Sequence, residues 1–80
     1  MVFEQDVASR FVRKLGLRQS RSKDEMKKFA ARTREWEGDG NNVDQAAMKA
    51  AKDMFPDFEA AGYAGVLDAM ENLLADIERL

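Results

Sequence analysis

The sequence predicts an all-α fold, a small bundle of three long helices plus a short helical turn around Pro56. Apolar residues recur at intervals of three and four along most of the chain, which is the spacing of one helix face. Glycine, asparagine and proline separate these periodic segments, where they favour turns. A chain of 80 residues makes one domain, so we expect a single helical domain over residues 1–80 whose short loops favour antiparallel neighbours.

The first segment repeats an apolar residue at every fourth position. This series consists of Phe3, Val7, Phe11 and Leu15. A period of four places these side chains on one face of a helix, which we expect to be the core face. Gly16 follows the series and suits a C-terminal cap, because glycine adopts the left-handed conformation at little cost.

A second helix is predicted to begin at residues 22–25, which have the spacing of a capping box. Ser22 can accept a hydrogen bond from a first-turn amide, and Glu25 can reach back to the amide of Ser22. The apolar positions that follow keep the three-four spacing: Met26, Phe29, Ala30, Thr33 and Trp36. We expect Gly38 to end this helix.

A polar loop over residues 38–42 separates the second predicted helix from the third. Asn42 is a suitable N-cap, with Gln45 three residues later. We expect the third helix to run from Val43 to about Met54 and to present a face of low volume that another helix can approach closely. That face consists of Val43, Ala47, Ala50, Ala51 and Met54.

Pro56 interrupts the helical pattern because proline cannot continue an established helix. We predict a corner here, with a short turn of helix from Pro56 to Ala61 that Gly62 stops. Gly62 and Gly65, together with the alanines of the third helix, are expected to mark the closest helix crossing.

The last segment carries the clearest apolar stripe of the chain. Its members are Val66, Leu67, Met70, Leu73, Leu74, Ile77 and Leu80. The stripe predicts a core helix over residues 66–80. Some of its members also alternate four and three like the seam of a coiled coil, so the alternative is a homodimer through this helix. The seam would consist of Val66, Met70, Leu73, Ile77 and Leu80.

Charge divides the chain into two halves, although the net charge is only −2. Ten of the 13 lysines and arginines lie between Arg10 and Arg34, where two carboxylates oppose them, whereas residues 35–80 carry eleven acids against three bases. Such a separation indicates either a surface for an anionic partner or two segments that neutralise each other in the fold. In the second case the basic helices pack beside the acids of the last helix: Asp68, Glu71, Asp76 and Glu78.

The chain contains no histidine and no cysteine, which removes the commonest general base, the soft metal ligands and the thiol nucleophile. No serine stands in a glycine-rich phosphate loop or a strand-to-helix elbow. We therefore expect a protein that is not an enzyme and that uses no cofactor or metal. The lack of cysteine suits the cytoplasm, and no stretch approaches the roughly 20 apolar residues of a membrane span, so we expect a cytoplasmic protein without a membrane partner.

Two local patterns begin like known motifs and then depart from them. Residues 14–20 resemble the turn of a helix-turn-helix motif, but Ser22 and Glu25 stand where a recognition helix buries apolar residues. Residues 35–44 resemble a calcium loop, but Ala46 occupies the twelfth position, where calcium needs a bidentate carboxylate. A helix connection is the better interpretation of both segments.

We interpret the chain as a small helical interaction or regulatory protein, an adaptor or inhibitor of the kind found in phages and mobile elements. Its basic N-terminal half and its aromatic corners would bind a macromolecular partner, which we expect to be another protein. The alternative is a nucleic-acid-binding regulator that uses the basic first two helices and dimerises through the acidic C-terminal helix. The expected contact residues are Arg10, Arg13, Lys14, Arg18, Arg21, Lys27, Lys28, Arg32, Trp36 and Tyr63, whereas Phe55 and Phe58 are expected in the core.

Overall fold

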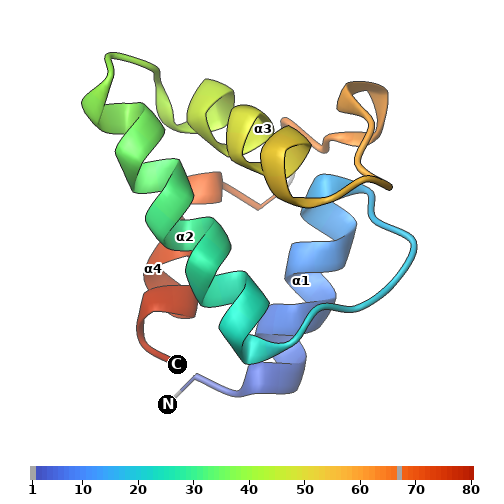
Figure 1. Cartoon of the computed structure of the whole chain (residues 1–80). Helices are drawn as coiled ribbons and strands as arrows, with labels where there is room; N and C mark the ends of the chain where they lie inside the picture. The colour runs from blue at the N-terminus through green and yellow to red at the C-terminus, as the bar shows by residue number, and fades with distance from the viewer. Residues whose placement is uncertain (1, 67) are drawn as a thin grey trace.

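The computed structural model describes residues 2–66 and 68–80, and its regular structure there is entirely helical. The elements in chain order are α1 (Glu4–Leu15), α2 (Lys23–Gly38), α3 (Val43–Met54), the 3-10 turn η1 (Ala60–Gly62) and α4 (Met70–Glu78) (Figure 1). The predicted all-α bundle is confirmed. Within the described residues it has four α-helices rather than three long ones.

The capping boxes predicted for α2 and α3 are both present. Ser22 Oγ accepts from the amide of Glu25 at 3.2 Å, and Glu25 Oε1 accepts from the amide of Ser22 at 3.1 Å. Asn42 and Gln45 exchange the same pair of bonds, at 2.8 and 3.3 Å. Each box satisfies two amides that the first turn of a helix leaves without partners, and a cap of this kind is worth about 1 kcal/mol.

Most of the predicted face of α1 lies in the core, with one exception at its start. Val7, Phe11 and Leu15 are at most 1 % exposed, whereas Phe3 is 60 % exposed. The expectation for Phe3 is wrong because the helix begins only at Glu4, and Phe3 is an extended N-cap with φ −97°.

Three phenylalanines from different segments meet at the centre of the molecule. The ring of Phe11 lies edge-on to Phe29 and to Phe55, with centroid separations of 5.1 and 5.7 Å. Phe29 and Phe55 stack at 6.0 Å. Phe55 and Phe58 are both buried, as expected. This trio ties α1 and α2 to the end of α3, and each aromatic pair adds about 0.5–1.5 kcal/mol beyond its buried area.

The alanine face of α3 packs against α2, its most extensive neighbour. Ala47, Ala50 and Ala51 are fully buried, and Ala46, which the sequence pattern did not include, is buried with them. Small side chains permit this close approach. The ends of the predicted face, Val43 and Met54, are only half-buried.

A close backbone approach joins Gly16 and Gly62. Gly16 is the left-handed C-cap of α1, with φ +66°, and a Cβ built on it would lie 2.5 Å from the carbonyl oxygen of Gly62. The expected crossing of Gly62 and Gly65 with α3 is therefore wrong. Gly62 packs on the end of α1 instead, and a Cβ on Gly65 would meet nothing within 4 Å.

The connection between α1 and α2 does not make an antiparallel hairpin. In Figure 1 the chain leaves the upper end of α1, runs back alongside it and begins α2 near the N-terminal half of α1. Ser20 of this connection accordingly borders a shallow groove with Ser9 and Val12 of α1. Leu17 is 7 % exposed and anchors the connection to the core. This geometry differs from the short turn of a helix-turn-helix motif.

The short turn after α3 begins later than predicted. Pro56 lies in a non-helical turn, and the helical turn covers Ala60–Gly62 rather than residues 56–61. The amide of Phe58 donates to the carbonyl of Phe55 at 3.1 Å, which closes the corner without a continuing helix. Burial of the two phenylalanines holds this shape.

The last helix begins at Met70, four residues later than predicted. Val66 is 98 % exposed, Leu67 lies outside the described residues, and Asp68 has a left-handed φ of +54° that interrupts a helix. Residues 63–66 and 68, which we call the strap, instead cross the end of α1. The amide of Ala64 donates to the carbonyl of Lys14 at 2.9 Å, so α1 satisfies backbone groups that a helix would otherwise use.

The predicted dimer seam is not a surface of this fold. Met70, Leu73 and Ile77 are at most 2 % exposed because α4 packs them against α1, α2 and α3. Of the other two seam positions, Val66 lies on the strap and Leu80 is half-buried after the end of α4. A homodimer through this set of residues would require α4 to leave its own core.

Candidate interaction surface

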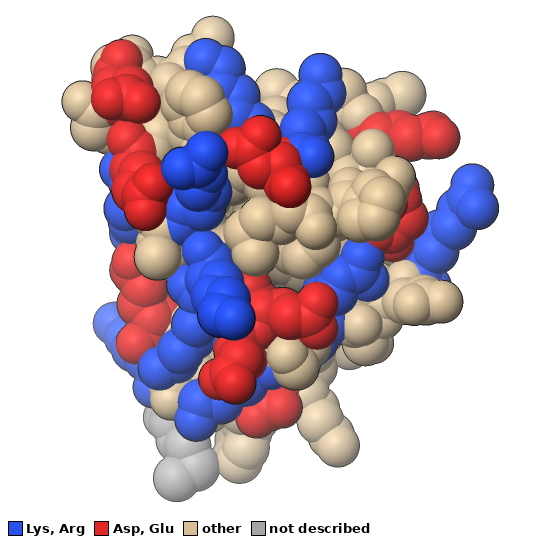
Figure 2. Space-filling view, in the orientation of Figure 1, with Lys and Arg blue, Asp and Glu red and all other residues tan. Residues whose placement is uncertain are grey.

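Four arginines of the basic half pair with carboxylates of the acidic half. The pairs are Arg10 with Asp68 and Asp76, Arg21 with Asp57, Arg32 with Asp53, and Arg34 with Glu71 and Glu78. In Figure 2 lysine and arginine atoms alternate with carboxylates over the visible face. For these four arginines, the charge separation along the sequence becomes neutralisation in space.

Arg34 makes the largest of these networks, and the sequence prediction had not included it among the contact residues. Its guanidinium donates to both oxygens of Glu78 at 3.1 Å, to Glu71 at 2.8 Å and to Glu37 at 2.8 Å. These bonds raise the pKa of Arg34, with Glu78 the largest contributor, and lower the pKa of Glu78 below its usual range. The network joins α2 to α4.

Arg21 is a structural residue in this fold. Its side chain is 11 % exposed, its guanidinium carbon lies 4.7 Å from the ring centroid of Phe55, and it hydrogen-bonds to Asp57. Asp57 also accepts from the backbone amide of Arg18 at 3.2 Å. Burial raises the pKa of Asp57, but the Arg18 amide and the charge of Arg21 outweigh it and hold that pKa below its usual value.

Arg32 and Trp36 form a second cluster, between α2 and α3. Asp53 accepts from Arg32 Nη2 at 3.1 Å and from Trp36 Nε1 at 3.2 Å. The charged groups of Arg32 and Lys49 lie 5.3 and 5.0 Å from the Trp36 ring. Trp36 is half-buried, and its polar atom and its ring both have partners within the chain.

Lys14 and Tyr63 are engaged at the strap. Lys14 is 2 % exposed, and its ammonium donates to the carbonyl of Ala64 at 2.5 Å and lies 5.0 Å from the Tyr63 ring. Tyr63 donates its hydroxyl proton to Asp44 at 2.5 Å. Burial, followed by this bond, raises the pKa of Tyr63. Lys14 is therefore a buried clamp, not an exposed contact, because its long stem lies beneath the strap.

Five cations of the basic half form no ion pair within residues 2–66 and 68–80. They are Arg13, Arg18, Lys23, Lys27 and Lys28, all exposed. We call this set the residual basic surface, and it covers the end of α1, the connection and the first turns of α2. The sequence prediction had included all of them except Lys23. Lys23 stands one turn before Lys27 on the same helix, and this spacing could have identified it as a contact residue.

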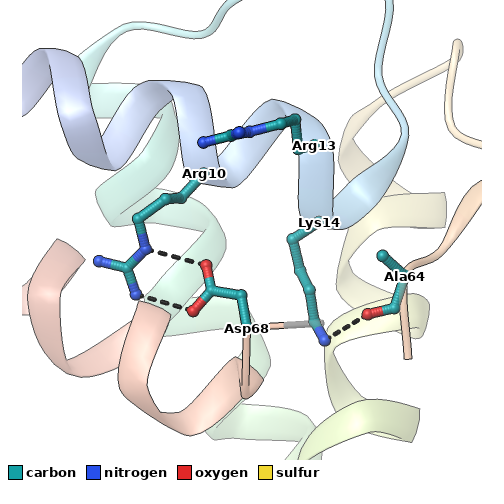
Figure 3. Close-up of a pocket in the computed structure, with 5 residues that line it drawn as sticks. All are labelled: Arg10, Arg13, Lys14, Ala64 and Asp68. Carbon is teal, nitrogen blue, oxygen red and sulfur yellow. Dashed lines mark hydrogen bonds and ion pairs between the residues drawn. The ribbon is translucent and has the colours of Figure 1, made fainter. Parts of the chain in front are cut away.

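A pocket of about 350 Å³ opens between α1 and the strap (Figure 3). It is lined by Arg10, Arg13, Lys14, Ala64 and Asp68. Arg10 closes one side by donating two hydrogen bonds to Asp68, at 2.9 and 3.0 Å, and the Lys14–Ala64 bond closes the other. Sequence reasoning missed this pocket because it depends on the shape of the strap, where the sequence had predicted helix only from Val66 onward.

The described part of the chain offers no cluster of three or more side chains able to hold a metal ion. None of its helices has the length and apolar character needed to cross a bilayer. No protein-family model, curated protein or solved structure matches the chain.

Proposed function

We propose that the protein is a non-enzymatic interaction protein whose residual basic surface binds an acidic surface of another protein. The observation that carries this proposal is the division among the basic residues. Arg10, Arg21, Arg32 and Arg34 are neutralised within the fold, whereas five other cations of the basic half are exposed and form no ion pair in the described chain.

Stability does not account for these five exposed charges. Surface ion pairs contribute about 0–1 kcal/mol each, and these cations form none. Lys23, Lys27 and Lys28 lie within the first two turns of α2, and like charges so placed favour an oppositely charged surface and speed its association. We therefore expect binding whose association rate falls steeply as salt is added.

A nucleic acid would present the same charge as an acidic protein. Most of the aromatic rings do not favour it, because Phe11, Phe29 and Phe55 lie in the core and the ring of Trp36 lies against Arg32 and Lys49. Among the described residues, the one largely exposed ring is that of Phe3, which precedes α1 and is not part of the residual basic surface. Recognition of single strands normally uses exposed rings on which bases stack. We therefore favour a protein partner and treat duplex backbone binding as the outcome that would replace it.

Charge reversal tests the proposal. Lys27→Glu with Lys28→Glu changes two residues of the residual basic surface that form no hydrogen bond or ion pair within the described chain. Lys52→Glu on α3 is the control, since Lys52 is also exposed and has no ion pair there. In quantitative affinity purification from the native host, we expect a partner that is retained by the wild type and the control and lost by the double variant.

Two results would count against the proposal. Equal recovery of every co-purifying protein by the wild type, the double variant and the control would overturn the role of the basic surface. Micromolar, salt-dependent binding of mixed-sequence duplex DNA, abolished by the double variant, would replace the protein partner with a nucleic acid. Fluorescence anisotropy at low and physiological salt measures the second.

A further inference from the structure

We propose that the pocket between α1 and the strap binds a small organic carboxylate with a short apolar body. This inference goes beyond the interaction surface, because it concerns a small ligand and a cavity that shares only Arg13 with that surface. It rests on the size of the pocket, the character of its walls and the charges at its edge.

The walls of the pocket suit an apolar body. Its volume of about 350 Å³ lies at the small end of the range of ligand pockets, about 300–1,000 Å³. The lining is mostly apolar, since long basic side chains expose aliphatic stems along their length and Ala64 contributes a methyl group. A hydrated inorganic ion gains nothing from such walls.

The charges at the edge of the pocket suit an anion. Among the described residues, three cations and one carboxylate line it. The Arg10 guanidinium is already occupied by Asp68 and Asp76. Arg13 is exposed, forms no ion pair within the described residues and uses only Nε, in a 3.4 Å bond to the carbonyl of Ser9. Its terminal nitrogens have no partner in that part of the chain, and a guanidinium can bind a ligand carboxylate with two parallel bonds.

The pKa of Asp68 indicates the sign of the electrostatic potential at its carboxyl group, on the edge of the pocket. The pKa of its carboxyl is held below the usual value chiefly by the hydrogen bonds from Arg10, with the charges of Lys14 and Arg13 adding to the effect. Lys14 and Arg13 thus favour negative charge at the edge of the pocket from a distance. A carboxylate ligand would also meet the negative charge of Asp68, so it is expected on the Arg13 side of the pocket, where Lys14 and Arg13 favour an anion.

Both sides of the pocket are fixed before a ligand arrives. In Figure 3 the Arg10–Asp68 pair and the Lys14–Ala64 bond hold the strap to α1 on opposite sides of the opening. A site held in this way needs little ordering on binding, which lowers the cost of association. Arg13 is the exposed cation of the lining, and a bound carboxylate would fix its side chain.

The test is a ¹H–¹⁵N NMR titration of the full chain with hexanoate as the probe. We expect saturable shifts at the amides of Arg13, Lys14, Ala64 and Asp68, with a dissociation constant on the order of 1 mM. Hexanol has the same apolar body without the charge, and inorganic phosphate has charge without the body. Both should bind at least about tenfold more weakly, a difference of about 1.4 kcal/mol.

A matched pair of variants assigns the effect to Arg13. Arg13→Gln should weaken hexanoate about tenfold or more and leave the weak binding of hexanol unchanged. Arg18→Gln, which also removes one exposed arginine of the residual basic surface, should bind hexanoate like the wild type. The amide spectra of both variants confirm the fold.

Three results would overturn the proposal: no saturable shifts at these amides, hexanol binding as tightly as hexanoate, or Arg13→Gln binding like the wild type. The failure of this proposal is distinguishable from that of the interaction surface. The double variant at Lys27 and Lys28 leaves the pocket intact and should bind hexanoate normally.

Discussion

Gly16 occupies a position that no other residue type fits without strain. Its φ of +66° lies in the region that favours glycine. A Cβ built on Gly16 would lie 2.5 Å from the backbone carbonyl oxygen of Gly62. Gly16→Ala should lower the free energy of unfolding by roughly 2 kcal/mol or more, the sum of the conformational cost and the clash. Urea denaturation followed by circular dichroism measures this change.

Gly38→Ala provides the matched control for that experiment. Gly38 ends α2 with no positive φ, and nothing lies within 4 Å of a Cβ built there. Alanine should be neutral or stabilise by up to about 1 kcal/mol, because it favours the helix. If both substitutions changed stability equally, the close approach of Gly16 to Gly62 would be wrong.

Lys14 stabilises the strap through its ammonium, and its substitution tests that role. Lys14→Met keeps most of the buried stem and removes the donor to the carbonyl of Ala64. The loss should cost about 1–3 kcal/mol, because a part-buried carbonyl is left with one partner fewer. Arg13→Met, at an exposed neighbour on α1, should change the free energy of unfolding by no more than about 0.5 kcal/mol. If Lys14→Met and Arg13→Met changed the free energy of unfolding equally in chemical denaturation, the role of Lys14 as a buried clamp would be contradicted.

At the scale of elements, the contact between α2 and α3 depends on small side chains. Ala51 is fully buried, with 0 % of its surface exposed, so Ala51→Leu adds three carbons where no space is free. We expect a loss of about 1–3 kcal/mol from overpacking. Ala31→Leu, on the exposed side of α2, serves as the control and should be close to neutral. Thermal unfolding measures both variants. Equal midpoint temperatures for Ala51→Leu and Ala31→Leu would contradict the close packing of α2 on α3.

The attachment of α4 and the strap should weaken in acid. The pKa values of Asp68 and Glu78 in the folded protein are lowered chiefly by hydrogen bonds from Arg10 and Arg34 respectively. A lowered folded pKa stabilises the fold above the unfolded value, near 4 for a carboxyl, and this stabilisation is lost as pH falls through the folded pKa.

The free energy of unfolding should therefore fall as the pH drops below about 4, and fall less in the double variant Asp68→Asn, Glu78→Gln. Urea titrations at a series of pH values measure the slope. An identical slope in wild type and variant would show that these two carboxylates do not carry the effect.

The starts of α2 and α3 were predictable because their signals are local. Ser22 and Asn42 each stand three residues before a side chain that completes a capping box, and Gly16 marks the end of α1 in the same way. The start of α4 was not predictable from its apolar stripe. It depends on Asp68, whose partner Arg10 lies 58 residues earlier in the chain.

The predicted contact residues also divide into those that a local signal identifies and those whose position depends on contacts distant in the sequence. Exposed Arg13, Arg18, Lys27 and Lys28 follow from charge along the chain, whereas the burial of Lys14 depends on the position of the strap. The pocket has no sequence signal, because two of its lining residues, Ala64 and Asp68, come from that same segment.

At the scale of the whole molecule, the fold converts a division of charge along the sequence into two populations of basic residues. One population joins helices by pairing with the acidic half, as Arg34 does with Glu71 and Glu78. The other forms the residual basic surface. Folding therefore pairs part of the basic half and leaves the rest exposed, which is the central claim of our account; we propose that a partner binds the exposed part.

The most direct test of this claim compares the free energies of unfolding of Arg34→Glu and Lys27→Glu by urea denaturation. Arg34→Glu places a fourth carboxylate among Glu37, Glu71 and Glu78 and should destabilise the fold by about 1 kcal/mol or more. Lys27→Glu should stay within about 0.5 kcal/mol of the wild type. Equal losses, or a larger loss for Lys27→Glu, would contradict the division of the basic residues into an internally paired set and an exposed one.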